Sequence, residues 1–558
     1  MASFRSAFPA SMPRPSLPVS PLSLVSLVCL LLAVPVLGVL GSWLAWDAQA
    51  ISILQHQLTT VLPEYARSSL VLAVSVGLGV AVLGGATAAA VSLFEFPLRR
   101  FFEWALLLPM AMPAYVAAYA YTDFLQYSGA LQMGLRKAFN LQGALWPDVR
   151  SMPGAIVLFI FCLYPYVYLL TRTALNERGV ALMEAARSLG AGTLRRVREV
   201  ALPLARPALA AGVALALMET LADYGVGAYF GLTTLTTGVY KAWLVMNDRL
   251  AAAQLASVLL GVVLLLLWLE RRAQARMRFA SSRSGALHAN EARRLRLQGL
   301  AAAGTFALCA LPILIGFVLP VGVLVGLLRE EALHGELGLP LERFFQWSLT
   351  SLELSGLAAL LTVGLALVLA YAARQQQGAG RRQPWLAWSI RIVGLGYAVP
   401  GAVIAVGILL PVGWLQIHWP ELGLTPLMTG SIAGLMYAYL VRFSGVALQS
   451  VESGYARISG HVDESARMLG ASRWRLFIEL HAPLLARSTL AAALLVFVDV
   501  MKELPATLVL RPFNSDTLAV VAYQLARDER LSEAALPSLA MVLVGLAPVL
   551  LLSRAMRR

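Results

Sequence analysis

The sequence has 558 residues, of which 59% are hydrophobic and only 13% are charged, and its mean hydropathy is +0.73. Soluble globular chains carry about 25% charged residues, so the composition excludes an ordinary soluble domain and predicts a membrane protein. The net charge of +14 does not call for a nucleic acid partner, because the basic inner face of a membrane protein meets anionic lipid.

Apolar runs long enough to cross a bilayer recur along the whole chain. A helix needs about 20 predominantly apolar residues to span a hydrocarbon core of about 30 Å. The runs predict an all-α polytopic protein with about 12 transmembrane helices. We place these spans at 22–44, 68–91, 102–125, 154–171, 206–224, 253–269, 299–327, 351–373, 388–410, 428–447, 489–509 and 533–553.

The first span follows a Ser- and Pro-rich segment, 1–21, that contains Arg5 and Arg14. A cleaved signal peptide has an apolar region of about 7–15 residues, and this run is longer than that. We therefore expect a retained first helix. A cleaved signal peptide is the alternative, because Ala48-Gln49-Ala50 resembles a cleavage site.

The basic residues predict the orientation of the spans. Most of the 44 Lys and Arg residues fall on one side of the membrane if both termini are cytoplasmic, with large groups in 172–206, 270–298 and 442–488. Cytoplasmic loops are enriched in Lys and Arg. We therefore expect a multi-pass protein with both termini in the cytoplasm.

A polar loop occurs twice in this apolar chain, and the two copies match position by position. The first repeated loop, 184–203, contains Glu184, Ala185, Ala186, Gly190 and Pro203. The second repeated loop, 464–483, contains Glu464, Ser465, Ala466, Gly470 and Pro483. The constant separation between equivalent residues predicts two related halves, and the basic residues place both loops in the cytoplasm.

The residue types in these loops favour a seat for a partner protein. We expect a short helix from Glu184 to Leu189, on which small side chains permit close approach, and Gly190 suits the left-handed conformation that ends a helix. A second short amphipathic helix should follow until Pro203 interrupts it before the next span. A helix that merely lies at the membrane interface is the alternative, which the duplication disfavours.

The order of spans repeats on either side of a basic connector. Each half has a span that begins with Ser-Leu (Ser69-Leu70, Ser351-Leu352), then a span that contains a proline (Pro113, Pro400). Because both repeated loops face the same side, the six-helix repeats are parallel. The predicted units are an N-terminal tail with the first helix (1–66), the first repeat domain (67–269), a cytoplasmic linker (270–298), a linking helix with an external loop (299–349) and the second repeat domain (350–553).

Four carboxylates follow the repeated loops and repeat with the same separation as the loops themselves. Glu219 and Asp223 lie in one predicted span, and Asp499 and Glu503 lie in its counterpart. A separation of four residues places each pair on one face of a helix. Ionisable groups inside spans usually face an aqueous path, so these residues are candidates for a cation pathway. Structural pairing is the alternative, since Lys502 could neutralise Asp499, and a position at the membrane interface is a further alternative for Asp223 and Glu503.

Nothing in the sequence indicates catalysis or a stable metal site. The cysteines, Cys29, Cys162 and Cys309, are scattered among predicted spans, and the six histidines form no cluster with metal-ligand spacing. A P-loop needs a Gly-Lys pair, but Lys137, Lys241 and Lys502 follow Arg136, Tyr240 and Met501. The chain is therefore expected to be no enzyme, to bind no cofactor and to lack an ATPase site of its own.

The repeated loops resemble the EAA loop, the cytoplasmic coupling loop of ABC importer permeases. The first copy fits the pattern Glu-Ala-Ala, three residues, Gly, nine residues and apolar-x-Leu-Pro, whereas the second departs from it at Ser465 and Ala482. The resemblance implies the type I ABC importer permease fold. It also implies two copies of an ABC ATPase subunit that bind ATP and Mg, seated on Glu184, Ala185, Ala186, Gly190, Pro203 and on Glu464, Ser465, Ala466, Gly470, Pro483.

The segments after the loops resemble a particular subfamily, the fused ferric iron importer permeases. The resemblance rests on Met218 to Gly225, on Lys502 to Phe513 and on Asp516-Thr517-Leu518-Ala519. It implies a bacterial inner-membrane permease that receives Fe(III) from a periplasmic binding protein. Related fused permeases are similar to transporters of thiamine, phosphonates or polyamines, so these substrates are alternatives.

A second class of function remains from the residues alone. A secondary transporter or channel built from two parallel repeats would need no ATPase partner. The polar loops at 184–203 and 464–483 favour an ATP-driven importer, because an ion-coupled carrier has no use for two matched cytoplasmic seats.

Overall fold

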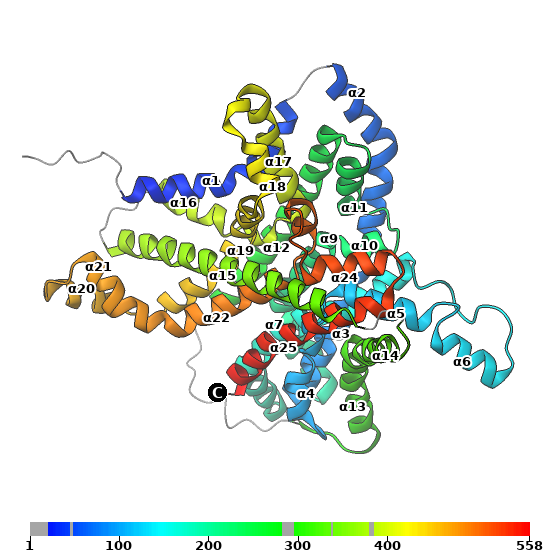
Figure 1. Cartoon of the computed structure of the whole chain (residues 1–558). Helices are drawn as coiled ribbons and strands as arrows, with labels where there is room; N and C mark the ends of the chain where they lie inside the picture. Colours follow the sequence, from blue (N-terminus) through cyan, green and yellow to red (C-terminus); the bar gives the residue numbers. More distant parts are fainter. Residues whose placement is uncertain (1–20, 45–47, 282–294, 336–338, 379–383, 558) are drawn as a thin grey trace, which may run out of the picture.

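The computed structural model is a helical membrane protein, and it describes residues 21–44, 48–281, 295–335, 339–378 and 384–557 (Figure 1). Its first half contains the helices α1 (Pro21–Gly41), α2 (Ala48–His56), α3 (Leu62–Leu93), α4 (Arg99–Ala105), α5 (Ala114–Leu125), α6 (Ala130–Phe139), α7 (Met152–Ser188), α8 (Thr193–Arg196), α9 (Leu202–Ala222), α10 (Gly225–Tyr229), α11 (Leu235–Tyr240) and α12 (Arg249–Ser281).

The second half repeats this order with small changes. Its helices are α13 (Gly299–Ile313), α14 (Leu319–His334), α15 (Leu341–Gly378), α16 (Pro384–Val393), α17 (Gly401–His418), α18 (Leu424–Gly430), α19 (Ile432–Tyr455), α20 (Gly460–Met468), α21 (Arg473–Arg475), α22 (Ala482–Met501), α23 (Pro505–Leu510), α24 (Leu518–Arg527) and α25 (Leu531–Arg557). Short 3₁₀ and π segments, η1 to η9, join several of them.

The predicted membrane spans are confirmed in number. Within the described residues, 11 helices are long and apolar enough to cross a bilayer, and a bent pair brings the total to 12. This pair, Arg99–Ala111 and Ala114–Phe139, turns through 89° at Pro113. The predicted span 388–410 is likewise divided, into α16, η7 (Gly396–Ala398) and α17, at Pro400. Each proline directly precedes the helix that follows the break, α5 or α17, where no amide donor is needed.

Each repeat contains an equivalent hydrogen bond between two of its own helices. The hydroxyl of Ser69 in α3 accepts a hydrogen bond from the Leu235 amide at 2.9 Å, at the start of α11. The hydroxyl of Ser351 in α15 accepts one from the Leu518 amide at 2.8 Å, at the start of α24. Each serine therefore satisfies a free amide of a helix N-terminus. The prediction that these spans begin at the Ser-Leu pairs is wrong, because α3 begins at Leu62 and α15 begins at Leu341.

The first span of each half packs against the other half. Helix α1 crosses α17 of the second half so closely that a Cβ atom at Gly38 would lie 2.7 Å from the Gly407 carbonyl oxygen. The leading span of the second half, α13–η6–α14, approaches α7 of the first half. There a Cβ atom at Gly316 would lie 2.5 Å from the Phe161 carbonyl oxygen. Each hydrophobic core thus contains helices from both halves.

A two-residue parallel sheet joins the end of the linker to the first half. Strand β1 (Phe94–Glu95) pairs with β2 (Leu295–Arg296). Leu295 and Val197 of the first repeated loop pack against the same small apolar cluster. The linker therefore returns to the side of the molecule that carries the repeated loops.

The predicted interruption of the helix at Pro203 is wrong, and the equivalent Pro483 does not interrupt its helix either. Both prolines lie in the first turn of a span, α9 or α22, and a π-helical segment continues directly into each span, η4 (Val197–Ala201) and η9 (Leu476–His481). A proline ring clashes with the carbonyl four residues earlier in an α-helix. The wider π turn relieves this clash, so the helix continues without a break.

Candidate functional site

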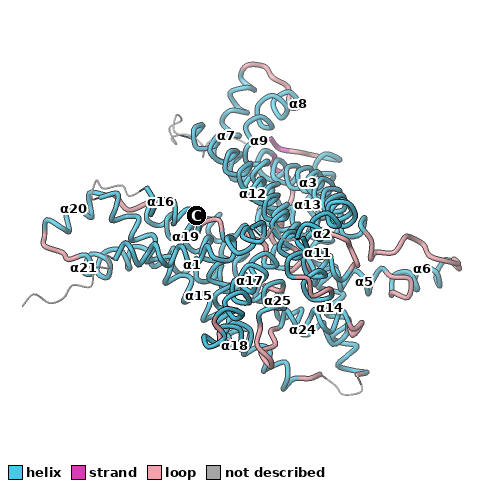
Figure 2. Tube along the Cα trace, turned by 90° about the horizontal axis from the view of Figure 1, so that it is seen from above, coloured by secondary structure: helices cyan, strands magenta, loops and turns pink. Residues whose placement is uncertain are grey.

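The repeated loops form the tips of two arms that project from the body of the protein (Figure 2). In the first loop, Gly190 has φ +83°, and in the second loop Gly470 has φ +81°. The Ala191 amide donates to the Ala186 carbonyl at 3.0 Å, and the Ala471 amide donates to the Ala466 carbonyl at 3.1 Å. This is the Schellman arrangement that ends a helix at a left-handed glycine, so the predicted turn conformation is confirmed at both glycines.

The helix that carries each seat differs between the copies. A separate short helix was expected from Glu184 to Leu189, and that expectation is wrong, since these residues are the end of α7, a continuous helix of 37 residues. The second seat does lie on a separate helix, α20. The Ser465 hydroxyl donates to the His461 carbonyl of the same helix at 2.8 Å, so the Ala-to-Ser change adds no free polar group. The Glu184 side chain lies outside the described residues.

Each seat presents a large apolar side chain at its tip. Leu189 is 89% exposed and Leu469 is 87% exposed, and these residues are equivalent in the two copies. Exposed apolar side chains at matched positions, beside small residues such as Ala185 and Ala186, are typical of a protein-binding surface. Glu464 is also largely exposed, and His461 lies 3.4 Å from it.

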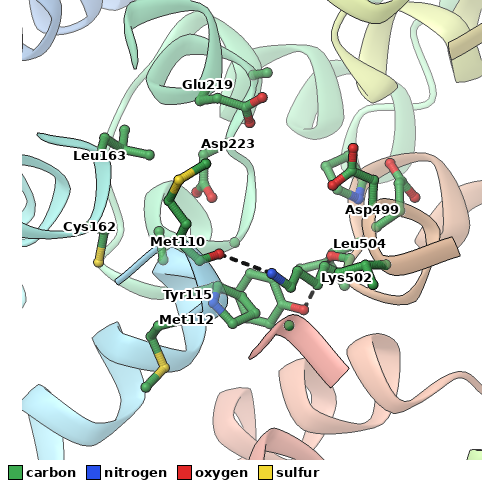
Figure 3. A pocket seen from close by; sticks show the side chains of 18 of the residues that line it. Met110, Met112, Tyr115, Cys162, Leu163, Glu219, Asp223, Asp499, Lys502 and Leu504 are labelled. Carbon is green, nitrogen blue, oxygen red and sulfur yellow. Dashed lines mark hydrogen bonds between the residues drawn. The ribbon is translucent and has the colours of Figure 1, made fainter. Parts of the chain in front are cut away.

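A cavity of about 220 Å³ lies between the two halves, and all four predicted carboxylates contribute to its lining. Figure 3 shows three of them, Glu219, Asp223 and Asp499. Residues of η3 (Leu108–Ala111), α5, α7, α9, α19, α22 and α25 complete the wall. The structure thus brings Glu219 and Asp223 of the first repeat together with Asp499 and Glu503 of the second.

The prediction that each pair of carboxylates lies on one face of a single helix is wrong. Helix α9 ends at Ala222 and α22 ends at Met501, so Asp223 and Glu503 lie just beyond the helices. Asp223 accepts a hydrogen bond from the Val226 amide at 2.7 Å, at the start of α10. Glu503 accepts one from the Ala506 amide at 2.9 Å, at the start of α23. Both therefore satisfy free amides of the short helix that follows.

Glu503 is fully engaged by protein groups. Its carboxylate pairs with the Arg442 guanidinium at 3.1 Å and accepts hydrogen bonds from the Thr507 amide at 2.9 Å and the Thr507 hydroxyl at 2.6 Å. Its side chain is only 1% exposed. This carboxylate therefore has the contacts of a structural residue, with a partner, Arg442, that the sequence analysis did not identify.

Glu219 and Asp499 have far fewer partners. The Tyr397 hydroxyl, from the second half, donates to Glu219 at 3.2 Å. Among the described residues, none donates a hydrogen bond to Asp499, and no ion pair joins Asp499 to Lys502. The Lys502 ammonium instead donates to the Met110 carbonyl of the first half at 3.0 Å. The two equivalent acids Glu219 and Asp499 are therefore the carboxylates left available to the cavity.

The sequence reasoning missed Arg442 and Tyr397. A signal for Arg442 was present, because an arginine inside the predicted span 428–447 is costly unless it is paired or functional. In the first half, Cys162 stands at the position of Arg442, and Ala222 stands at that of Lys502. The first half therefore contributes two acids and no base to the cavity lining, whereas the second contributes two acids and two bases. Nothing local identified Tyr397, which reaches Glu219 only through the packing of the two halves.

Comparison with known proteins agrees with this architecture. Residues 81–279 match the family described as "Binding-protein-dependent transport system inner membrane component". The chain is 24% identical to an Fe(3+)-transport system permease protein, FbpB 2, of Haemophilus influenzae, over 88% of this chain and 90% of that protein.

Other relatives match part of the chain. The sulfate transport system permease protein CysT of Salmonella typhimurium is 30% identical over 33% of this chain and 66% of its own. The putative 2-aminoethylphosphonate transport system permease protein PhnV of the same organism is 28% identical over 47% of this chain and 96% of its own. Residues 81–279 thus contain the domain described for binding-protein-dependent transport system inner membrane components, and the two six-helix repeats suggest a fused two-domain permease.

Proposed function

We propose that this chain is the membrane subunit of an ATP-driven importer that carries Fe(III) delivered by a periplasmic binding protein. Two copies of an ABC ATPase subunit would sit on the repeated loops from the cytoplasm, where both termini of the chain would also lie. The observation that carries the proposal is the pair of matched loops, each with a left-handed glycine and an exposed leucine at its tip.

The assignment of the cargo has two supports. The relative that matches nearly the whole chain is named for Fe(3+) transport. In addition, the cavity between the halves contains Glu219, Asp223 and Asp499 against one ammonium group, that of Lys502, once Glu503 and Arg442 are counted as a pair. An excess of carboxylates attracts a cation and repels an anion, so the cavity favours Fe(III) over phosphonate.

In this proposal Glu219 and Asp499 would draw the cation through the membrane by charge. Because each repeat supplies one of these two acids, neither repeat alone would form the path. The Glu503–Arg442 pair would hold the wall of the cavity in shape, and Asp223 would both cap α10 and contribute negative charge.

The proposal is tested by purifying the full chain with its nucleotide-binding subunit and reconstituting the complex into lipid vesicles. We expect ATP hydrolysis that rises when the iron-loaded binding protein is added, together with iron entry into the vesicles. Iron entry without ATP, driven by an ion gradient, would instead identify a secondary transporter. Hydrolysis that responds to a phosphonate-loaded binding protein and not to the iron-loaded one would assign the alternative cargo.

A further inference from the structure

A buried polar cluster lies beneath the second repeated loop. We call it the anchor cluster, and it consists of Arg374 in α15, Tyr455 in α19, Asp463 in α20 and His481 in η9. One oxygen of Asp463 pairs with Arg374 Nε at 2.9 Å, and the other lies 3.1 Å from His481 Nε2. Arg374 also donates to the Ile458 carbonyl at 2.8 Å. Three elements, α15, α20 and η9, therefore meet at one carboxylate, and Tyr455 of α19 joins them through His481.

The polar atoms of His481 and Asp463 in the anchor cluster have hydrogen-bond partners within the cluster. His481 is fully buried, and its Nδ1 lies 3.4 Å from the Tyr455 hydroxyl. With the proton on Nε2, the imidazole donates to Asp463 and accepts from Tyr455, so both ring nitrogens are satisfied. Burial alone would raise the pKa of Asp463, but the hydrogen bonds from Arg374 and His481 outweigh it and hold that pKa below its usual value. The carboxylate is therefore charged at neutral pH.

The second loop needs such a cluster because its helix is broken. In the first half, α7 runs without interruption to Ser188, so the first seat is the end of a membrane-spanning helix. In the second half, α19 ends at Tyr455, and residues 456–459 form a turn before α20 begins. Without a tether, α20 would be free to swing about this turn.

The equivalent positions in the first half contain no such cluster. Ala201 stands at the position of His481, Leu175 at that of Tyr455, and Met183 at that of Asp463. Counting from the Ser69 and Ser351 pair, Ser92 stands at the position of Arg374. Ala201 and Leu175 instead line an apolar hollow of about 390 Å³. The polar tether is therefore a property of the second loop and not of the shared fold.

We propose that the anchor cluster is a positioning device that fixes the second ATPase seat rigidly to the membrane helices, in place of the helix continuity that fixes the first. This inference rests on the proposed function, since it assigns a mechanical role to the same loops. Arg374, Asp463 and His481 are positioning residues, because they would act on the seat through α20, and Asp463 and His481 are buried.

The test compares His481→Ala, which copies the first half, and Asp463→Asn with the unmodified chain in lipid nanodiscs. Hydrogen exchange reports local opening, and we expect amides 460–468 to exchange at least about tenfold faster in both variants, with no change at 185–192. In the reconstituted complex, cargo moved per ATP hydrolysed should fall, while ATPase subunits stay bound. Glu533→Gln is the matched control, since it removes an ion pair with Arg530 outside the loops and should change neither measurement.

The outcomes separate this inference from the proposed function. Unchanged exchange at 460–468 in both variants would overturn the anchor, and so would a rise in exchange throughout the chain, which would make the cluster a general part of the fold. Faster exchange at 460–468 with an unchanged ratio of cargo to ATP would overturn the role in coupling. If the unmodified chain retains no ATPase subunit, the proposed function is wrong, whatever the exchange result.

Discussion

The two halves of the molecule share one backbone plan but differ in the charges buried inside it. Ser69 and Ser351, Gly190 and Gly470, and the π turns before Pro203 and Pro483 recur in equivalent places. At three interior positions the second half has a cation, and the first half has a small uncharged side chain. These pairs are Arg374 and Ser92, Arg442 and Cys162, and Lys502 and Ala222.

This comparison separates the caps and turns that both halves share from the buried cations that only the second half has at these positions. Caps and turns satisfy backbone groups that every such repeat exposes, so both halves retain them. Cations at these three positions are not required by the shared fold, since the first half has uncharged residues there. The charges are therefore better understood as devices that set the shape of the cavity and the stiffness of one loop.

The largest expected effect comes from removing one partner of a buried pair in the second half. Arg442→Ala leaves Glu503 buried without its cation, and breaking such a pair costs about 3–5 kcal/mol. The equivalent change in the first half, Cys162→Ala, should cost about 1 kcal/mol. Unfolding titrations of the purified chain in detergent measure both free energies. Equal costs would show that the charge difference between the halves has no bearing on stability.

The next largest effect should come from changing the equivalent glycines of both repeated loops together. Gly190→Val with Gly470→Val places a β-branched residue at positive φ, which costs about 1–2 kcal/mol at each position and misplaces both seats. Substrate-stimulated ATP hydrolysis should fall at least about tenfold, while the chain still inserts into the membrane. Glu184→Lys and Glu464→Lys should act in the same direction by reversing charge. Normal coupling in the glycine double variant would contradict the assignment of the loops.

A smaller effect should sharpen the comparison within the cavity. Glu219→Gln combined with Asp499→Asn removes the two carboxylates that the protein leaves available, and iron uptake should fall about tenfold with the complex intact. Glu219→Gln with Asp223→Asn should also reduce uptake, because it removes both unbalanced acids of the first half. Variants that assemble and transport iron at the unmodified rate would exclude an electrostatic pathway. Variants that fail to assemble would make the carboxylates structural.

The smallest effect concerns the tips of the loops. Leu189→Ser and Leu469→Ser alter side chains that are almost fully exposed, so the free energy of unfolding should change by less than about 0.5 kcal/mol. Binding of the ATPase subunit should nevertheless weaken several-fold in each single variant, as measured by retention during purification. Unchanged retention would show that the seat lies elsewhere on the arms. A much larger loss from one variant would show that the two seats are not equivalent.

The sequence by itself determined the number of spans, the parallel duplication and the left-handed glycines of the repeated loops. These features depend on hydrophobicity, on spacing and on the special backbone freedom of glycine, and all three are local properties. It also indicated which carboxylates to examine, because charged residues are conspicuous in apolar spans.

Only the tertiary structure decided where helices end, which half each leading span covers and which charges pair. The span limits around Asp223 and Glu503 depend on amides of the next helix that those carboxylates cap. Prolines at 203 and 483 are tolerated because a π turn precedes each one, and proline alone does not announce that turn. The Arg442–Glu503 pair and the anchor cluster join side chains from separate helices. Such contacts arise from the packing of whole helices, and no local pattern records them.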